Sequence, residues 1–83
     1  MKTIIGLQVS EEMTEKFIIY CKICNDPKEN IKGLILDRFE KHKEKKGIFR
    51  LTFYSFENVI GFFYGLGRVV DLNFTDSLQF HNN

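Results

Sequence analysis

Hydrophobic residues recur at a period of two at the start of the chain, over residues 3–9. The apolar set at a period of two is Ile5, Leu7 and Val9, and the residues between them are Ile4, Gly6 and Gln8. This alternation is typical of a strand with one face in a core. The sequence therefore begins with a predicted β-strand.

A helix is predicted from Ser10 to Asn25. Ser10 can accept a backbone N–H at the helix start, and Glu11 and Glu12 suit the positive end of the helix dipole. Asn25 tolerates the left-handed conformation found at helix ends. Between them, apolar residues recur at spacings of three and four, as expected for a buried stripe: Met13, Phe17, Tyr20, Cys21 and Cys24.

A second helix is predicted to follow directly. Asp26 can cap it, Pro27 suits its first position and Glu29 can close a capping box. The four lysines of residues 41–46 suit the negative end of the dipole, and Gly47 would stop the helix. Its apolar stripe would be Ile31, Leu34, Ile35 and Phe39.

Residues 47–83 differ in composition, with seven of the nine Phe and only five charged side chains. Alternating apolar residues predict strands at 49–53 and 70–74. The intervening segment fits a short helix capped by Ser55, but it is rich in strand formers, and Gly65-Leu66-Gly67 could be a hairpin loop. A three-stranded meander is favoured slightly over a strand-helix-strand unit.

These patterns predict an α+β chain in two parts. Residues 1–46 would form a strand-helix-helix module, and residues 47–83 a β-rich extension. Because the 83 residues are 43% apolar, the extension is expected to be ordered and to add to an oligomer. Its expected buried residues are Phe49, Phe53, Val70, Leu72 and Phe74.

The first part resembles the ribbon-helix-helix superfamily of Arc, MetJ and CopG-like repressors. The resemblance rests on I-I-G-L-Q-V-S-E-E-M, F-I-I-Y-C-K-I-C-N-D-P and N-I-K-G-L-I-L-D-R-F, and covers residues 3–46. It implies that two chains pair their strands antiparallel and lay this ribbon in the major groove of double-stranded DNA.

The resemblance also implies site residues. Ile4, Gly6 and Gln8 would face the bases, where a glutamine can donate to and accept from adenine. Lys28 beside the second helix start and Lys2 beside the strand would contact phosphates.

The sequence gives little support for a metal site, a catalytic site or a membrane span. Cys21 and Cys24 have the spacing of half a zinc site, but His42 and His81 stand alone, so the cysteines are expected to pack in a core. No catalytic constellation is apparent, so neither an enzyme nor a cofactor is expected. No apolar run approaches the roughly 20 residues of a membrane span.

The sequence thus predicts a cytoplasmic transcriptional regulator that binds double-stranded DNA as a homodimer or a tetramer. The net charge of +1 is modest for a DNA-binding protein. The alternative is a protein-interaction module. It would use the ribbon-helix-helix only to dimerise and would bind a protein partner through residues 47–83.

Overall fold

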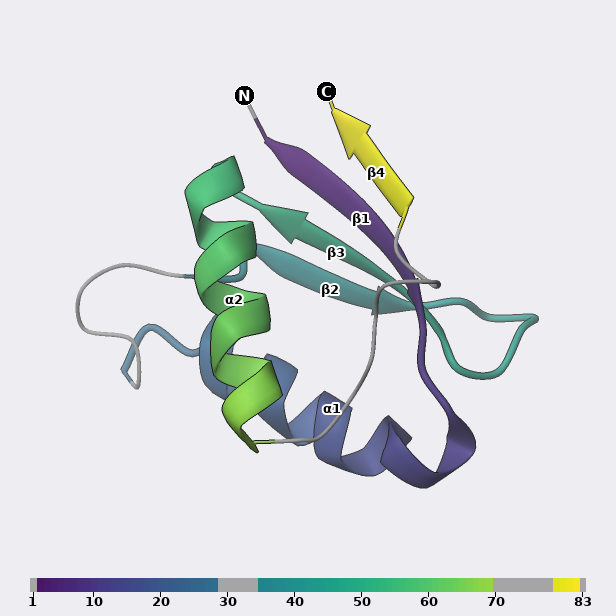
Figure 1. The fold of residues 1–83 in the computed structure, drawn as a ribbon. Helices are drawn as coiled ribbons and strands as arrows, with labels where there is room; N and C mark the ends of the chain where they lie inside the picture. Colours follow the sequence, from purple (N-terminus) through teal and green to yellow (C-terminus); the bar gives the residue numbers. More distant parts are fainter. Residues whose placement is uncertain (1, 29–34, 70–78, 83) are drawn as a thin grey trace.

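A computed structural model of the chain describes residues 2–28, 35–69 and 79–82 (Figure 1). In these ranges the chain alternates short strands and two helices. The elements are β1 (Thr3–Gln8), α1 (Glu11–Asn25), β2 (Arg38–Lys41), β3 (Ile48–Phe53), α2 (Phe56–Val69) and β4 (Gln79–Asn82).

The strands form one antiparallel sheet in the order β2-β3-β1-β4. β1 is an inner strand, in which Ile5 lies opposite Leu51 of β3 on one side and Phe80 of β4 on the other. This strand order, with the element order β-α-β-β-α-β, is the split β-α-β topology of ferredoxin-like domains. Such a topology hosts many activities and carries no function by itself.

The core lies between one face of the sheet and the two helices, which sit on the same side of it (Figure 1). The alternation of β1 buries Ile5 and Leu7 on this face, and β3 contributes Phe49, Leu51 and Phe53 in the same way. Four phenylalanines, Phe17, Phe49, Phe53 and Phe62, pack ring against ring at centroid distances of 5.1 to 6.3 Å. The opposite face of the sheet, referred to below as the open face, faces away from both helices.

The strand and the helix predicted over residues 3–25 are confirmed, as is the predicted strand over 49–53. Cys21 and Cys24 are buried thiols outside any disulfide and belong to the core, as expected. The predicted strand over 70–74, with Val70, Leu72 and Phe74, lies outside the described residues.

The predicted strand-helix-helix arrangement is wrong. Instead of a second helix ending near residue 46, the chain forms β2, a turn and β3. Pairing explains the difference, because Phe39 lies opposite Leu51 and Glu40 opposite Arg50, where the Arg50 guanidinium contacts the Glu40 carboxylate at 3.1 Å. These contacts across the sheet outweigh the helix propensity of a lysine-rich segment.

The favoured meander in the second half is wrong as well, and the strand-helix alternative is right up to Val69. Val59, Phe62 and Leu66 recur at helical spacing and are all buried, so amphipathic packing overrides the strand propensity of the segment. Ser55 caps the helix, since its Oγ accepts from the N–H of Asn58 at 3.4 Å.

Neither α1 nor α2 is long and apolar enough to cross a bilayer, nor is any other helix in the part of the chain that the structure describes.

Candidate nucleic-acid interface

The β2–β3 connection projects beyond the end of the sheet (Figure 1). His42 organises its turn, because the backbone N–H groups of Glu44 and Lys45 both donate to His42 Nδ1 at 3.2 Å. The N–H of His42 donates to the carbonyl of Ile48 at 2.8 Å and closes the loop.

Gly47 ends the turn with a φ of +77°, a conformation that side chains disfavour. Its carbonyl accepts from the N–H of Val9 at 2.7 Å, which ties the hairpin to the end of β1. A Cβ at this position would lie 2.5 Å from the carbonyl oxygen of Val9. Gly47 therefore sets the backbone conformation at the point where the hairpin joins the sheet.

Positive charge is concentrated in this hairpin. Residues 38–50, the basic hairpin, hold six basic and two acidic side chains, a net charge of +4. The other 70 residues hold six basic and nine acidic side chains, a net charge of −3. All side chains from Lys41 to Lys46 are exposed. The small net charge of the chain thus conceals an uneven distribution of charge along the sequence.

The basic hairpin continues onto the open face of the sheet. There Arg50 holds both carboxylate oxygens of Glu40, at 3.1 and 3.2 Å, and Arg38 lies 4.0 Å from the same group. Two arginines share one acid, so the cluster keeps a positive charge. Ile4 and Gly6 of β1 form the floor of a hollow of about 560 Å³ beside it, which Ile48, Glu40, Arg50 and residues 41–44 also line.

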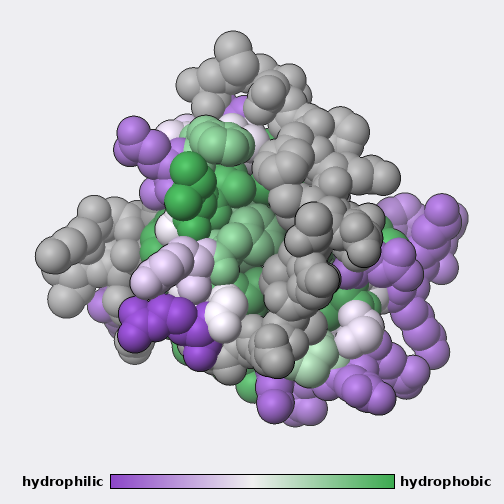
Figure 2. Space-filling model, in the orientation of Figure 1, coloured by the Kyte–Doolittle hydropathy of each residue, from purple (hydrophilic) through white to green (hydrophobic). Residues whose placement is uncertain are grey.

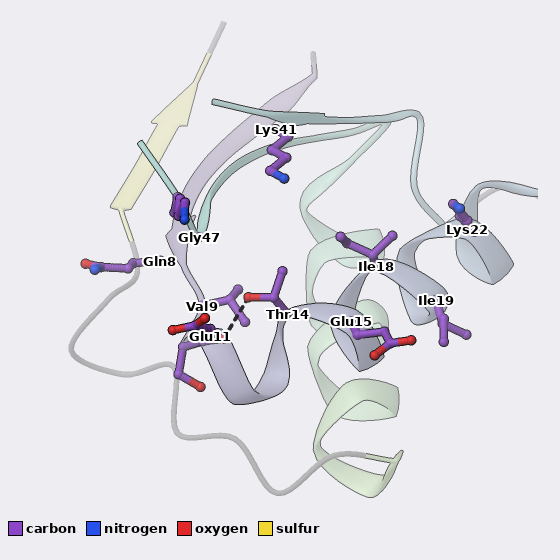
Figure 3. A pocket seen from close by; sticks show the side chains of 12 residues that line it. Gln8, Val9, Glu11, Thr14, Glu15, Ile18, Ile19, Lys22, Lys41 and Gly47 are labelled. Atoms are coloured by element: carbon purple, nitrogen blue, oxygen red, sulfur yellow. Dashed lines mark hydrogen bonds between the residues drawn. The ribbon is translucent and has the colours of Figure 1, made fainter. Parts of the chain in front are cut away.

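A second hollow, of about 670 Å³, lies between α1 and the base of the hairpin. In Figure 3, Ile18 of α1 and Lys41 of β2 face each other across it, with Lys22 at one end. Ile19 supplies an exposed apolar wall, and Glu11 and Glu15 offset the lysines. This groove is thus apolar at its floor and mixed in charge at its rim.

The structure places the predicted base-facing residues together, but on an inner strand. Ile4, Gly6 and Gln8 lie on the open face of β1, with Gln8 exposed at the end nearest the hairpin. β1 is hydrogen-bonded on both sides within its own chain, so it cannot pair with a second chain's β1 to form a ribbon.

The predicted phosphate contacts lie elsewhere. Lys2 is at the opposite end of β1 from the hairpin, where its Nζ is 2.8 Å from Asp37 and 5.7 Å from the centroid of the Tyr54 ring. The Lys28 backbone N–H donates to Asp26 Oδ1 in the loop after α1. Neither lysine joins the basic hairpin.

Arg38 and Arg50 are not among the predicted site residues. The sequence predicts a helix that ends in the lysine run, and basic residues are common at helix ends. The signal that could have shown the hairpin is Gly47 between this run and the clear strand at 49–53, since a glycine next to a strand often marks a tight turn.

Three titratable side chains outside the hairpin, Tyr20, Cys21 and Cys24, lie in or against the core. Burial raises the pKa of the Tyr20 hydroxyl and of the Cys21 and Cys24 thiols, so all three are neutral near pH 7. Within residues 2–28, 35–69 and 79–82, no group of three or more His, Cys, Asp and Glu side chains is placed to hold a metal ion. The basic hairpin with its adjoining hollows is therefore the candidate site.

No protein-family model matches the chain, and no curated protein or solved structure shows significant similarity to it.

Proposed function

We propose that the protein binds nucleic acid, with double-stranded DNA as its ligand, through the basic hairpin. The observation that carries the proposal is the net charge of +4 on residues 38–50 of a chain that is otherwise acidic. Lysines and arginines clustered on one projecting element are the electrostatic footprint of phosphate binding. A two-stranded hairpin also has the width that the major groove admits.

The contact with DNA would extend from the hairpin tip onto the open face of the sheet. Arg50 and Gln8 lie on it, on neighbouring strands that pair Gln8 with Ile48. Arginine and glutamine are side chains that read base edges, whereas the lysines of the turn would contact phosphates. The predicted role of Gln8 is thus kept, on an intrachain sheet instead of an intermolecular ribbon, and a role in gene regulation stays a prediction.

The proposal is tested by the salt dependence of binding to a short random duplex, followed by fluorescence anisotropy. In the hairpin variant, Lys43→Gln is combined with Lys45→Gln. The matched control combines Lys16→Gln with Lys28→Gln and has the same net charge, and all four lysines are exposed. The hairpin variant should flatten the slope of log K against log salt by about 2, one for each lost phosphate contact. Equal effects of both variants would show that the hairpin is not the site.

A second candidate function is binding of an extended peptide beside β2. The groove of about 670 Å³ runs between α1 and this edge strand, and Ile19 in its wall is 53% exposed. An edge strand offers backbone groups to an added strand, and the groove would take alternate side chains. Such binding would vary little with salt and would be lost on Ile19→Glu, which leaves the hairpin charges unchanged.

A further inference from the structure

The outer face of α2 carries apolar side chains that the fold leaves exposed. Ile60 is 59% exposed and Tyr64 is 69% exposed, one helical turn apart. Figure 2 shows this hydrophobic surface over the position of α2 in Figure 1. Val59, Phe62 and Leu66 already attach the opposite side of the helix to the core, so the outer face is not needed for folding.

The same face carries two charged residues and one glycine. Glu57 lies in the first turn of α2 and Arg68 in the last. Among the described residues neither forms an ion pair, and Arg68 only stacks near the Tyr64 ring, 5.9 Å from its centroid. Gly61 is exposed, and a Cβ added there would meet no atom within 4 Å. At 100° per residue, Glu57, Gly61, Tyr64 and Arg68 follow one another along a single line of the helix.

We infer that this face pairs α2 with the α2 of a second copy of the chain, antiparallel about a twofold axis. In such a pair, the register that sets Glu57 against the partner's Arg68 also sets Gly61 against the partner's Tyr64. Each end of the contact then joins opposite charges, and each tyrosine ring covers a glycine of the facing helix. One register thus pairs opposite charges and also places a large side chain opposite a glycine, and the twofold axis repeats each contact, as in any isologous interface.

A twofold contact would cover the side chains of α2 that a single chain leaves exposed. The absence of a side chain at Gly61 allows close approach of the two helices, and Ile60 and Tyr64 lose their exposed apolar surface. A single pair of helices buries less than the roughly 1,600 Å² of a stable complex, so the dimer dissociates on dilution. The basic hairpin remains accessible in such a pair, because it projects beyond the end of the sheet on the side away from α2 (Figure 1).

The test is sedimentation equilibrium of the whole chain over a dilution series, with three variants. Glu57→Arg places like charges at both ends of the pair and should raise the dimer Kd about tenfold. Arg68→Glu should do the same, and the double exchange should restore the wild-type Kd. Full restoration by the double variant is the signature of this register.

Gly61→Leu separates assembly from folding. The site is open in one chain and leucine is the better helix former, so thermal stability at a dilution where the chain is monomeric should not fall. In the pair the leucine would collide with the facing helix, and the Kd should rise about a hundredfold. A wild-type chain that stays monomeric at millimolar concentration would overturn the inference. So would a dimer that Gly61→Leu and the charge reversals leave intact.

Discussion

The hydroxyl of Tyr20 donates a hydrogen bond of 2.8 Å to the carbonyl oxygen of Phe62, and so joins α1 to α2 across 42 residues of chain. The ring of Tyr20 also packs on that of Phe62, with centroids 5.0 Å apart. The bond depends on a glycine, because a Cβ at Gly65 would collide with the Tyr20 hydroxyl. Tyr20, Phe62 and Gly65 therefore act as one contact between the helices.

This contact predicts a non-additive pair of substitutions. Tyr20→Phe keeps the ring and removes the bond, and should lower the free energy of unfolding by about 1 kcal/mol. Gly65→Ala should also destabilise the chain, although alanine is the better helix former, because its methyl group meets the hydroxyl. In the double variant the collision is gone, and Gly65→Ala should cost less than in the wild type.

Urea unfolding of the four chains of this cycle measures the coupling. Gly61→Ala is the matched control on the same helix, since its methyl group meets nothing within one chain. At a dilution where the chain is monomeric, it should stabilise the protein by roughly 0.5–1 kcal/mol. If Gly65→Ala gained stability as Gly61→Ala does, the close contact between Tyr20 and Gly65 would not exist.

Gly47→Ala should destabilise the hairpin strongly. The backbone there has a φ of +77°, which alone costs a side chain on the order of 1 kcal/mol. The added methyl group would also lie 2.5 Å from the carbonyl oxygen of Val9, and relief of that contact would disturb the bond from the Val9 N–H to Gly47. Thermal unfolding measures the loss, and an unchanged Tm would contradict the described turn.

The Lys2–Asp37 pair predicts a dependence of stability on pH. The hydrogen bond from Lys2, with a further one from Tyr54, lowers the pKa of the Asp37 carboxyl below its usual value. A lowered pKa in the folded state stabilises the protein above the unfolded pKa of about 4, and this contribution is lost as the pH falls through the folded value.

Asp37→Asn should therefore have a lower Tm than the wild type at pH 7. The difference should shrink as the pH falls below the unfolded pKa of about 4, and should be lost as the pH falls through the lowered pKa of the folded state. Measured by circular dichroism, a difference that did not change with pH would show that the substitution acts by something other than the lost charge.

The two thiols should react only when the chain unfolds. Cys21 is fully buried and Cys24 is 5% exposed, and burial raises the pKa of both thiols, so little thiolate is available. An aromatic disulfide reagent should thus modify neither at neutral pH in the folded chain, and both in urea. Rapid modification of the folded protein would contradict the packing of α1.

The sequence predicts those elements in which local pattern and burial agree. β1 and β3 alternate apolar and polar residues, and their apolar sets, such as Leu7 and Phe49, are the buried ones. α1 begins after Ser10 and ends at Asn25, as predicted, although the Ser10 side chain makes no cap hydrogen bond and Asn25 does not adopt a positive φ. In each of these elements a single period of hydrophobicity is long enough to decide the structure.

β2 could not be predicted in this way. It has four residues, too few to show a period, and two of its side chains, Arg38 and Lys41, are exposed charges on an edge strand. Its structure depends on Leu51 and Arg50, more than ten residues away. The candidate site lies on this hairpin, which the sequence does not predict. The resemblance to a strand-helix-helix module instead placed the predicted phosphate contacts at Lys2 and Lys28, and Arg50 was not among them.

The central claim is tested most directly by amide NMR of the labelled chain, titrated with a short DNA duplex at low salt. Binding by the basic hairpin predicts that the largest shift changes lie at residues 41–50, with smaller ones at Gln8 on the adjoining strand. Raising the salt should reverse them all together. No shift changes in the hairpin, or changes confined to α1 beside Ile18 and Ile19, would contradict nucleic-acid binding at this site.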